Sequence, residues 1–177
     1  PMEKLHKSLN GILPQQIRIK RIERAPISFN ARFDASSKLY RYTILNSDVG
    51  SPFCGRFAFF MPNRLDMDAM RNAAEYFIGR HSFSAFYAKD KKRNASSVIR
   101  TIKKVSIKKE GELINIDVEA NGFLHNMARR MAGAILLAGL GKISPNDIKK
   151  SLDNHKLSPK KYTAPSLGLC LMKVNYS

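Results

Sequence analysis

A strand pattern that passes directly into a helix pattern is the feature that most constrains the fold. Between residues 114 and 120, apolar and polar residues alternate, as expected for a strand with one buried face. From Leu124 to Leu136, apolar residues recur at the spacing of a core-facing helix. The period therefore changes from two to about 3.6 within a short stretch of chain.

Other segments give shorter signals of the same kinds. Strands are expected at residues 17–24, 38–46, 98–109 and 169–176. Asp66 is expected to cap a helix whose core face reaches Ile78, and Ser144 to cap a short helix. Because strands and helices mix without strict alternation, we predict a single α+β domain over 1–177. Its sheet should be mostly antiparallel and mixed, with the helices packed on one face.

Charge is the strongest signal in the composition. Thirty-one Lys and Arg oppose 14 Asp and Glu, giving a formal charge of +17. This balance favours a polyanionic partner, with a generally basic soluble protein as the alternative. No apolar run is long enough for a membrane span. Cys54 and Cys170 lack metal-ligand spacing, so we expect no structural zinc, and reduced thiols in a cytoplasm.

A cationic segment lies at the start of the 124–136 helix. At about 100° per residue, Arg129 falls on the flank of the core stripe and can reach the edge of a sheet. Arg130 falls toward the far side, where we expect it to face solvent or RNA. Both could instead be ordinary surface charges. His125 has no nearby nucleophile in the sequence, which favours a hydrogen-bonded histidine at a helix start.

Aromatic residues and arginines also alternate on the 38–46 strand. Tyr40, Arg41 and Tyr42 follow the segment 29–33, which contains Arg32. Base stacking and phosphate contact need such side chains, although half-buried strand aromatics would give the same pattern. The lysine-rich stretch 88–97 is interpreted as a mobile basic loop.

Several of these segments, taken in order, resemble the tRNA pseudouridine synthase A family. They are Phe29–Ala35, Tyr40–Asn46, Gly79–Phe86, Arg100–Ile102, Asn121–Arg129 and Thr163–Leu169. The resemblance covers nearly the whole chain and implies a pseudouridine-synthase-like half domain. It implies isomerisation of uridine to pseudouridine in the anticodon stem-loop of tRNA, by a cytoplasmic homodimer without metal or organic cofactor.

The resemblance also implies roles for particular residues. Tyr40 would stack on the flipped uracil and assist proton removal, and Arg129 would pair with the catalytic aspartate. Leu169 would line the uracil pocket. The remaining substrate-binding candidates are Arg32, Arg41, His125 and Arg130.

One part of the family pattern is absent. The aspartate belongs to an Arg-Thr-Asp motif, whereas the only Arg-Thr pair here, Arg100-Thr101, continues with Ile102. We therefore expect the C-terminal domain of such an enzyme, inactive without the N-terminal domain that carries the nucleophile. The alternatives are a non-catalytic RNA-binding or dimerisation module and a basic structural protein of a ribonucleoprotein. The last would leave Tyr40 and Arg129 apart, whereas the family would place them around one cleft.

Overall fold

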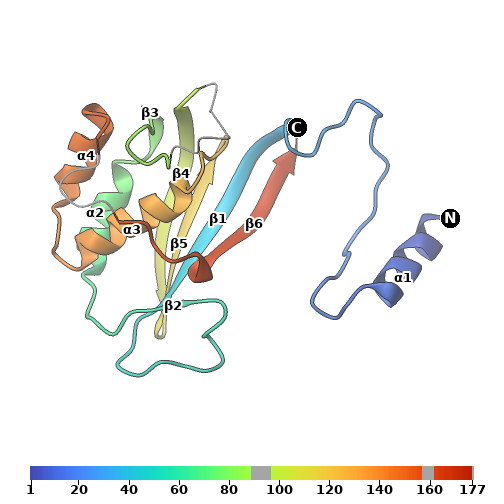
Figure 1. Ribbon diagram of the computed structural model, residues 1–177, viewed down its shortest axis with the longest axis horizontal. Helices are drawn as coiled ribbons and strands as arrows, with labels where there is room; N and C mark the ends of the chain where they lie inside the picture. The colour runs from blue at the N-terminus through green and yellow to red at the C-terminus, as the bar shows by residue number, and fades with distance from the viewer. Residues whose placement is uncertain (89–96, 157–161, 177) are drawn as a thin grey trace. The chain divides into compact units, whose positions relative to one another are not determined.

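The computed structural model describes residues 1–88, 97–156 and 162–176 (Figure 1). The chain forms two compact units, Pro1–Asp34 and Ala35–Ser177, which are described separately below. No helix in these described ranges is long and apolar enough to cross a membrane.

The first unit contains helix α1, Met2–Ile12, followed by an extended segment. The Asn10 side chain fixes this segment, because its Nδ2 donates to Ile19 O at 2.9 Å and its Oδ1 accepts from Ile19 N at 2.9 Å. The strand predicted at 17–24 was wrong. The backbone of Ile19 bonds to a side chain, and a β-type sequence forms no ladder without a partner strand.

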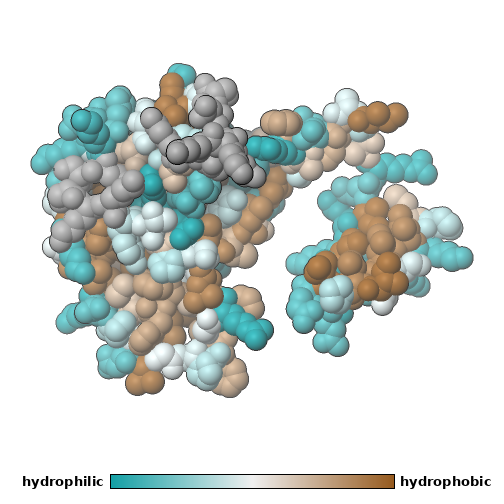
Figure 2. Space-filling view, viewed as in Figure 1, coloured by the Kyte–Doolittle hydropathy of each residue, from teal (hydrophilic) through white to brown (hydrophobic). Residues whose placement is uncertain are grey.

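Helix α1 itself was not predicted from the sequence. None of its residues is buried, and Leu5 and Ile12 are 50% and 79% exposed. Figure 2 shows hydrophobic side chains gathered on one side of this unit. Met2, Leu5, Leu9 and Ile12 do recur at helical spacing, a signal that the sequence prediction passed over, and no packed core supports the helix within the unit.

The second unit is built on a six-stranded sheet with the strand order β2-β1-β5-β4-β3, in which β6 also pairs with β1. Its strands are β1 Ala35–Leu45, β2 Phe59–Phe60, β3 Gly79–Ser82, β4 Ile99–Glu110, β5 Leu113–Ala120 and β6 Leu169–Tyr176. Every pairing is antiparallel except that of β1 with β2. The predicted α+β class with a mostly antiparallel sheet is therefore confirmed.

Three helices cover one face of this sheet (Figure 1): α2 Met67–Glu75, α3 Met127–Gly139 and α4 Pro145–Asp153. A short 3-10 helix, η1 Ser166–Gly168, precedes β6. As predicted, Asp66 caps α2, and Ser144 forms a capping box with Asp147 at the start of α4. Ile114, Ile116, Val118 and Ala120 of β5 are at most 3% exposed, so the core lies between the sheet and these helices.

Two helix boundaries differ from the predictions. Helix α2 ends at Glu75, so Ile78 is 46% exposed rather than part of the core face. Helix α3 starts at Met127 and not at Leu124, because Asn126 adopts a left-handed conformation with φ 58°. Leu124 is nevertheless buried in the turn before the helix. Residues 89–96 of the predicted basic loop lie outside the described residues.

Candidate functional site

Strand β1 places Tyr40 and Tyr42 on the face that the helices cover. The half-buried Tyr40 ring meets the Phe123 ring edge-on, with a centroid distance of 4.9 Å and an interplanar angle of 81°. Tyr42 is only 2% exposed, and its hydroxyl donates to Pro165 O at 2.9 Å. Burial raises the pKa of Tyr42, and the nearby Arg129 charge partly opposes that rise. The two tyrosines thus form the floor of the candidate site.

Arg129 is held in place from two sides. Its Nε donates to Ala164 O at 2.7 Å, and its Nη1 donates to Asn126 Oδ1 at 3.1 Å. A backbone hydrogen bond joins the same two residues, because Ala164 N donates to Arg129 O at 3.1 Å. Within the described part of the chain, Arg129 forms no ion pair with a carboxylate. A fixed guanidinium that has no acidic partner can receive an anion.

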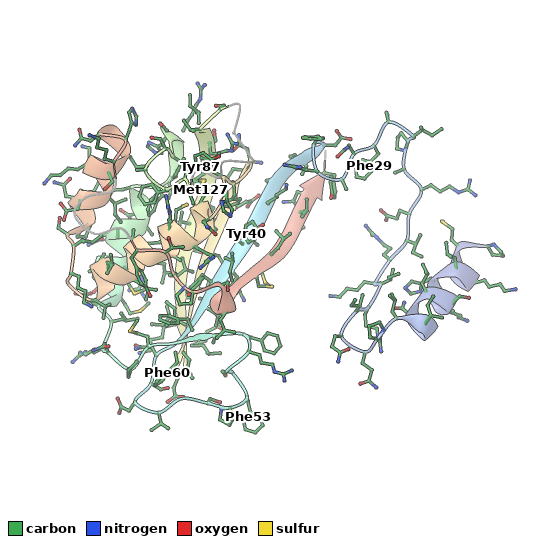
Figure 3. All side chains as sticks on the ribbon, viewed as in Figure 1. Phe29, Tyr40, Phe53, Phe60, Tyr87 and Met127 are labelled. Carbon is green, nitrogen blue, oxygen red and sulfur yellow. The ribbon has the colours of Figure 1, made fainter. Side chains whose placement is uncertain are left out.

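The segment 164–165 links the tyrosine floor to Arg129. Ala164 bonds to Arg129 and Pro165 bonds to Tyr42, so one short stretch of backbone is anchored to both α3 and β1. Gly168 allows the chain to return to the sheet, because a Cβ there would lie 2.5 Å from Thr43 O. Leu169 then pairs with Tyr42 across β1 and β6, half-buried against the core. Figure 3 shows Tyr40 on β1 and Met127 at the start of α3.

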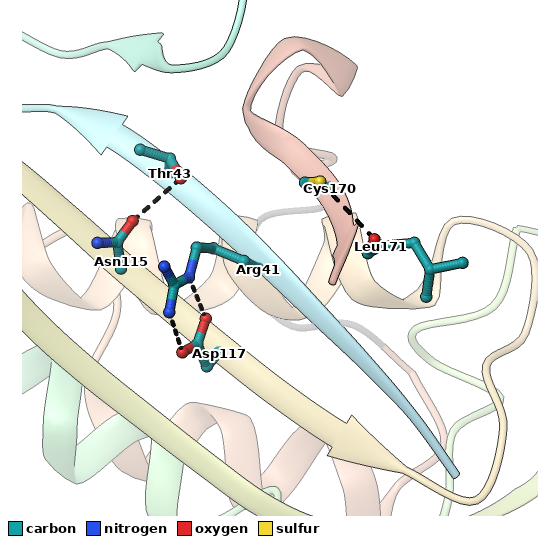
Figure 4. A network of polar contacts seen from close by, with 6 residues as sticks. All are labelled: Arg41, Thr43, Asn115, Asp117, Cys170 and Leu171. Atoms are coloured by element: carbon teal, nitrogen blue, oxygen red, sulfur yellow. Dashed lines mark hydrogen bonds and ion pairs between the residues drawn. The ribbon is translucent and has the colours of Figure 1, made fainter. Parts of the chain in front are cut away.

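Arg41 lies on the opposite face of β1. Its Nε and Nη2 donate to the two carboxylate oxygens of Asp117 at 2.7 and 2.8 Å, as Figure 4 shows. The hydrogen bond to Asp117 raises the pKa of Arg41. Arg41 and Tyr40 are neighbours in the sequence but do not share a face of the sheet. A substrate contact by Arg41 stays a prediction, and it would compete with this ion pair.

The remaining candidates divide between the two units. Arg32 belongs to the first unit, where its guanidinium lies 5.3 Å from the ring centroid of the exposed Phe33. His125 is exposed at the start of α3, and its Nδ1 lies 3.1 Å from Ala88 O. Ala88 N also donates to His125 O at 3.1 Å. His125 is therefore a hydrogen-bonded residue at a helix start that still reaches solvent.

The prediction that Arg130 faces solvent or RNA directly was wrong, because this residue is only 7% exposed. Every residue of α3 except Arg129 is buried, so other chain segments cover the helix on all sides. A helical projection predicts one buried face of the helix. It cannot show that other chain segments also bury the opposite face. Among these segments, residue Ala85 offers its carbonyl oxygen to Arg130 Nη1 at 3.5 Å.

Sequence reasoning assigned no role to Asn126 and Phe123, although both fall in a family-like segment. Asn126 stands where a helix cap is expected, but its side chain accepts a bond from Arg129 instead of capping α3. An asparagine just before a helix signals a cap in the sequence, so this use could not be anticipated. Within the described residues, no group of His, Cys, Asp and Glu could hold a metal ion.

Comparisons with known proteins give one consistent set of relatives. A family model described as tRNA pseudouridine synthase matches residues 73–177. A tRNA pseudouridine synthase A of Caldicellulosiruptor bescii is 39% identical over 176 residues, which cover 99% of this chain and 71% of the relative. The enzyme of the same name from Pelobacter propionicus is 42% identical with the same coverage. That of Thermoanaerobacter sp. (strain X514) is 40% identical over 179 residues.

Proposed function

Because this chain belongs to the tRNA pseudouridine synthase A family, we propose that it forms one wall of a uracil site. The reaction would be isomerisation of uridine to pseudouridine in the anticodon stem-loop of tRNA. One observation carries this proposal. Arg129 is held rigidly with no carboxylate partner in the described chain, on the same side of the sheet as the Tyr40 ring.

Tyr40 would act on the flipped base. A uracil taken out of its stack needs an aromatic surface to offset a few kcal/mol of unstacking. The Tyr40 ring packs edge-to-face with Phe123 and stays partly exposed, so it would be able to receive a base. The Tyr40 hydroxyl would then assist removal of the ring proton, accepting it while releasing its own proton to solvent, when the detached uracil is rejoined to the ribose through carbon.

Arg129 would act on the nucleophile. A carboxylate beside a fixed guanidinium stays ionised, which suits a group that must attack the nucleoside. Asn126 and Ala164 already occupy Nη1 and Nε, so Nη2 remains for the carboxylate. Leu169 would contribute an apolar wall to the uracil pocket, close to Tyr42.

The nucleophile would come from residues outside these 177. The sequence contains no Arg-Thr-Asp motif, and the chain spans 71% of the relatives to which it aligns. We propose that an N-terminal domain with that motif completes the site, and that the longer chain acts as a homodimer. Residues 1–177 alone would then bind tRNA weakly and form no pseudouridine.

A tritium-release assay with tritiated tRNA tests this division of roles. The 177-residue chain should give only background release. A fusion to the N-terminal part of the Caldicellulosiruptor bescii relative should restore release, because it supplies the carboxylate. Release by the 177 residues alone would refute the proposal that the nucleophile lies elsewhere.

The active fusion then allows each role to be tested. Tyr40→Phe should lower turnover by about 10²- to 10⁴-fold, the range for loss of a positioned proton acceptor. Arg129→Ala should lower it by at least about 10²-fold, as for loss of a fixed charge stabiliser. Arg71→Ala is the matched control, because Arg71 is exposed on α2 and, within the described residues, pairs only with Asp68. Near-normal turnover in either site variant would show that its assigned role is wrong.

A further inference from the structure

The first turn of α3 has no side chain that balances its partial positive charge within the described residues. This helix has 13 residues, with no acidic residue in its first turn and no side chain that caps it. The Asn126 side chain, the natural cap, is used by Arg129 instead. The partial positive charge of the first helical turn is therefore uncompensated by any side chain in the described ranges.

The buried guanidinium of Arg130 is a second and independent observation at this helix. The residue is only 7% exposed. Its Nε is shielded from solvent and has no hydrogen-bond partner in the described part of the chain. Its side-chain hydrogen bond within the described residues, from Nη1 to Ala85 O, is long at 3.5 Å. Burial lowers its pKa, and no acidic residue contributes to the shift. An unpaired buried guanidinium is costly unless an anion compensates it.

The Arg130 side chain is directed toward this helix start. Side chains in an α-helix lean toward its N-terminus, so Arg130 leans toward the first turn of α3. Its contact, Ala85, precedes Ala88, which is hydrogen-bonded to His125 in both directions. Tyr87 of this segment and Met127 of α3, both labelled in Figure 3, belong to the same buried core. The exposed His125 ring thus borders the helix start that Arg130 approaches.

We propose that the start of α3 is a binding site for a phosphate oxyanion, with Arg130 as its charged ligand and His125 at its rim. This site differs from the place of Arg129, whose guanidinium is tied to Asn126 and Ala164. A helix N-terminus and a desolvated guanidinium together are well suited to an oxyanion. That the phosphate comes from the tRNA backbone and not from free phosphate rests on the proposed function.

Thermal unfolding of the 177-residue chain with inorganic phosphate, compared with chloride at equal ionic strength, tests the site. Phosphate should raise the unfolding temperature of the native sequence above its value in chloride. Arg130→Met keeps the packing of the aliphatic side chain and removes the charge. It should unfold at the same or a higher temperature in chloride, and it should lose the extra effect of phosphate. Arg71→Met, at an exposed arginine, should keep that effect.

Fluorescence anisotropy with an anticodon stem-loop RNA identifies the source of the phosphate. Arg130→Met should weaken binding by about tenfold and reduce the salt dependence by about one phosphate contact. An effect of free phosphate without an effect on RNA affinity would support the site and assign it to free phosphate. These measurements need no turnover, so failure of the fusion enzyme to form pseudouridine would leave this site standing.

Two results would overturn the inference. A marked fall in the unfolding temperature of Arg130→Met in chloride would show that Arg130 already has a stabilising internal partner. Equal responses of the native chain to phosphate and chloride, with RNA affinity unchanged in Arg130→Met, would show that no oxyanion binds there.

Discussion

The two faces of strand β1 carry alternate residues of one short sequence and have opposite environments. Tyr42 and Ile44 face the helices and are 2% and 0% exposed. Arg41 and Thr43 face the other way, where they bond to Asp117 and Asn115 of β5 (Figure 4). The covered face is stabilised mainly by burial, and the open face by cross-strand polar pairs.

This difference changes how the Tyr40-Arg41-Tyr42 segment is understood. An aromatic residue next to an arginine suggests one composite surface for stacking and phosphate contact. On a strand, however, adjacent side chains point to opposite faces, so Tyr40 and Arg41 do not form one such surface. The arginine on the side of Tyr40 is Arg129, which arrives from a different element.

The largest expected effect separates the two faces by stability. Ile116 pairs with Tyr42 and is 1% exposed, so Ile116→Ala should lower the free energy of unfolding by about 2–5 kcal/mol. Thr43→Ala, on the open face, should lower it by only about 1 kcal/mol, because it removes one polar pair. Urea unfolding of both variants measures the difference. Equal losses would mean that the two faces are not distinct in energy.

A smaller effect is expected from removal of a single hydroxyl on the covered face. Tyr42→Phe should lower the free energy of unfolding by about 1 kcal/mol, because Pro165 O loses its hydrogen bond. Tyr40→Phe is the matched control. Its hydroxyl has no hydrogen bond in the described ranges, so stability should change by less than about 0.5 kcal/mol. The reverse order in urea unfolding would contradict the assignment of the structural tyrosine.

The elements with local patterns could be predicted from the sequence. Strand β5 alternates cleanly, α4 starts with a capping box, and β6 has the predicted bounds of 169–176. The failures are those in which a side chain takes the place of a partner strand, or in which the element is too short to show a period. The 17–24 segment has strand-like residues but bonds to the Asn10 side chain, and β2 is too short to show a period.

The same limit applies to the candidate site. Tyr40 and Arg129 could be selected from sequence patterns, and the pattern placed Arg129 on the flank of its helix. The contacts that hold the site could not be predicted in this way, because the bonded residues Tyr42 and Pro165 are 123 positions apart in the chain. Arg130 is likewise buried by chain segments that pack against α3, and the periodicity of the helix itself does not reveal them.

The ion pair on the open face should contribute less than the buried hydroxyl. The Arg41 and Asp117 side chains are 35% and 18% exposed, so solvent screens their attraction. A double-mutant cycle with Arg41→Met and Asp117→Asn should give a coupling energy of about 0.5–1 kcal/mol. Added salt should reduce it. A coupling that is both larger and insensitive to salt would show that this face is shielded from water.

The last effect is a pH dependence that belongs to Tyr42. Burial raises its pKa in the folded chain above the ordinary value of 10.0, because the neutral phenol is favoured there. Its stabilising contribution is therefore complete below about pH 10 and declines at higher pH, where the unfolded chain ionises first. The difference in unfolding free energy between the native chain and Tyr42→Phe should narrow as the pH rises past that value. Tyr40→Phe should show no comparable narrowing. A constant difference up to about pH 11 would mean that Tyr42 ionises equally easily in both states, and that the covered face does not exclude charge.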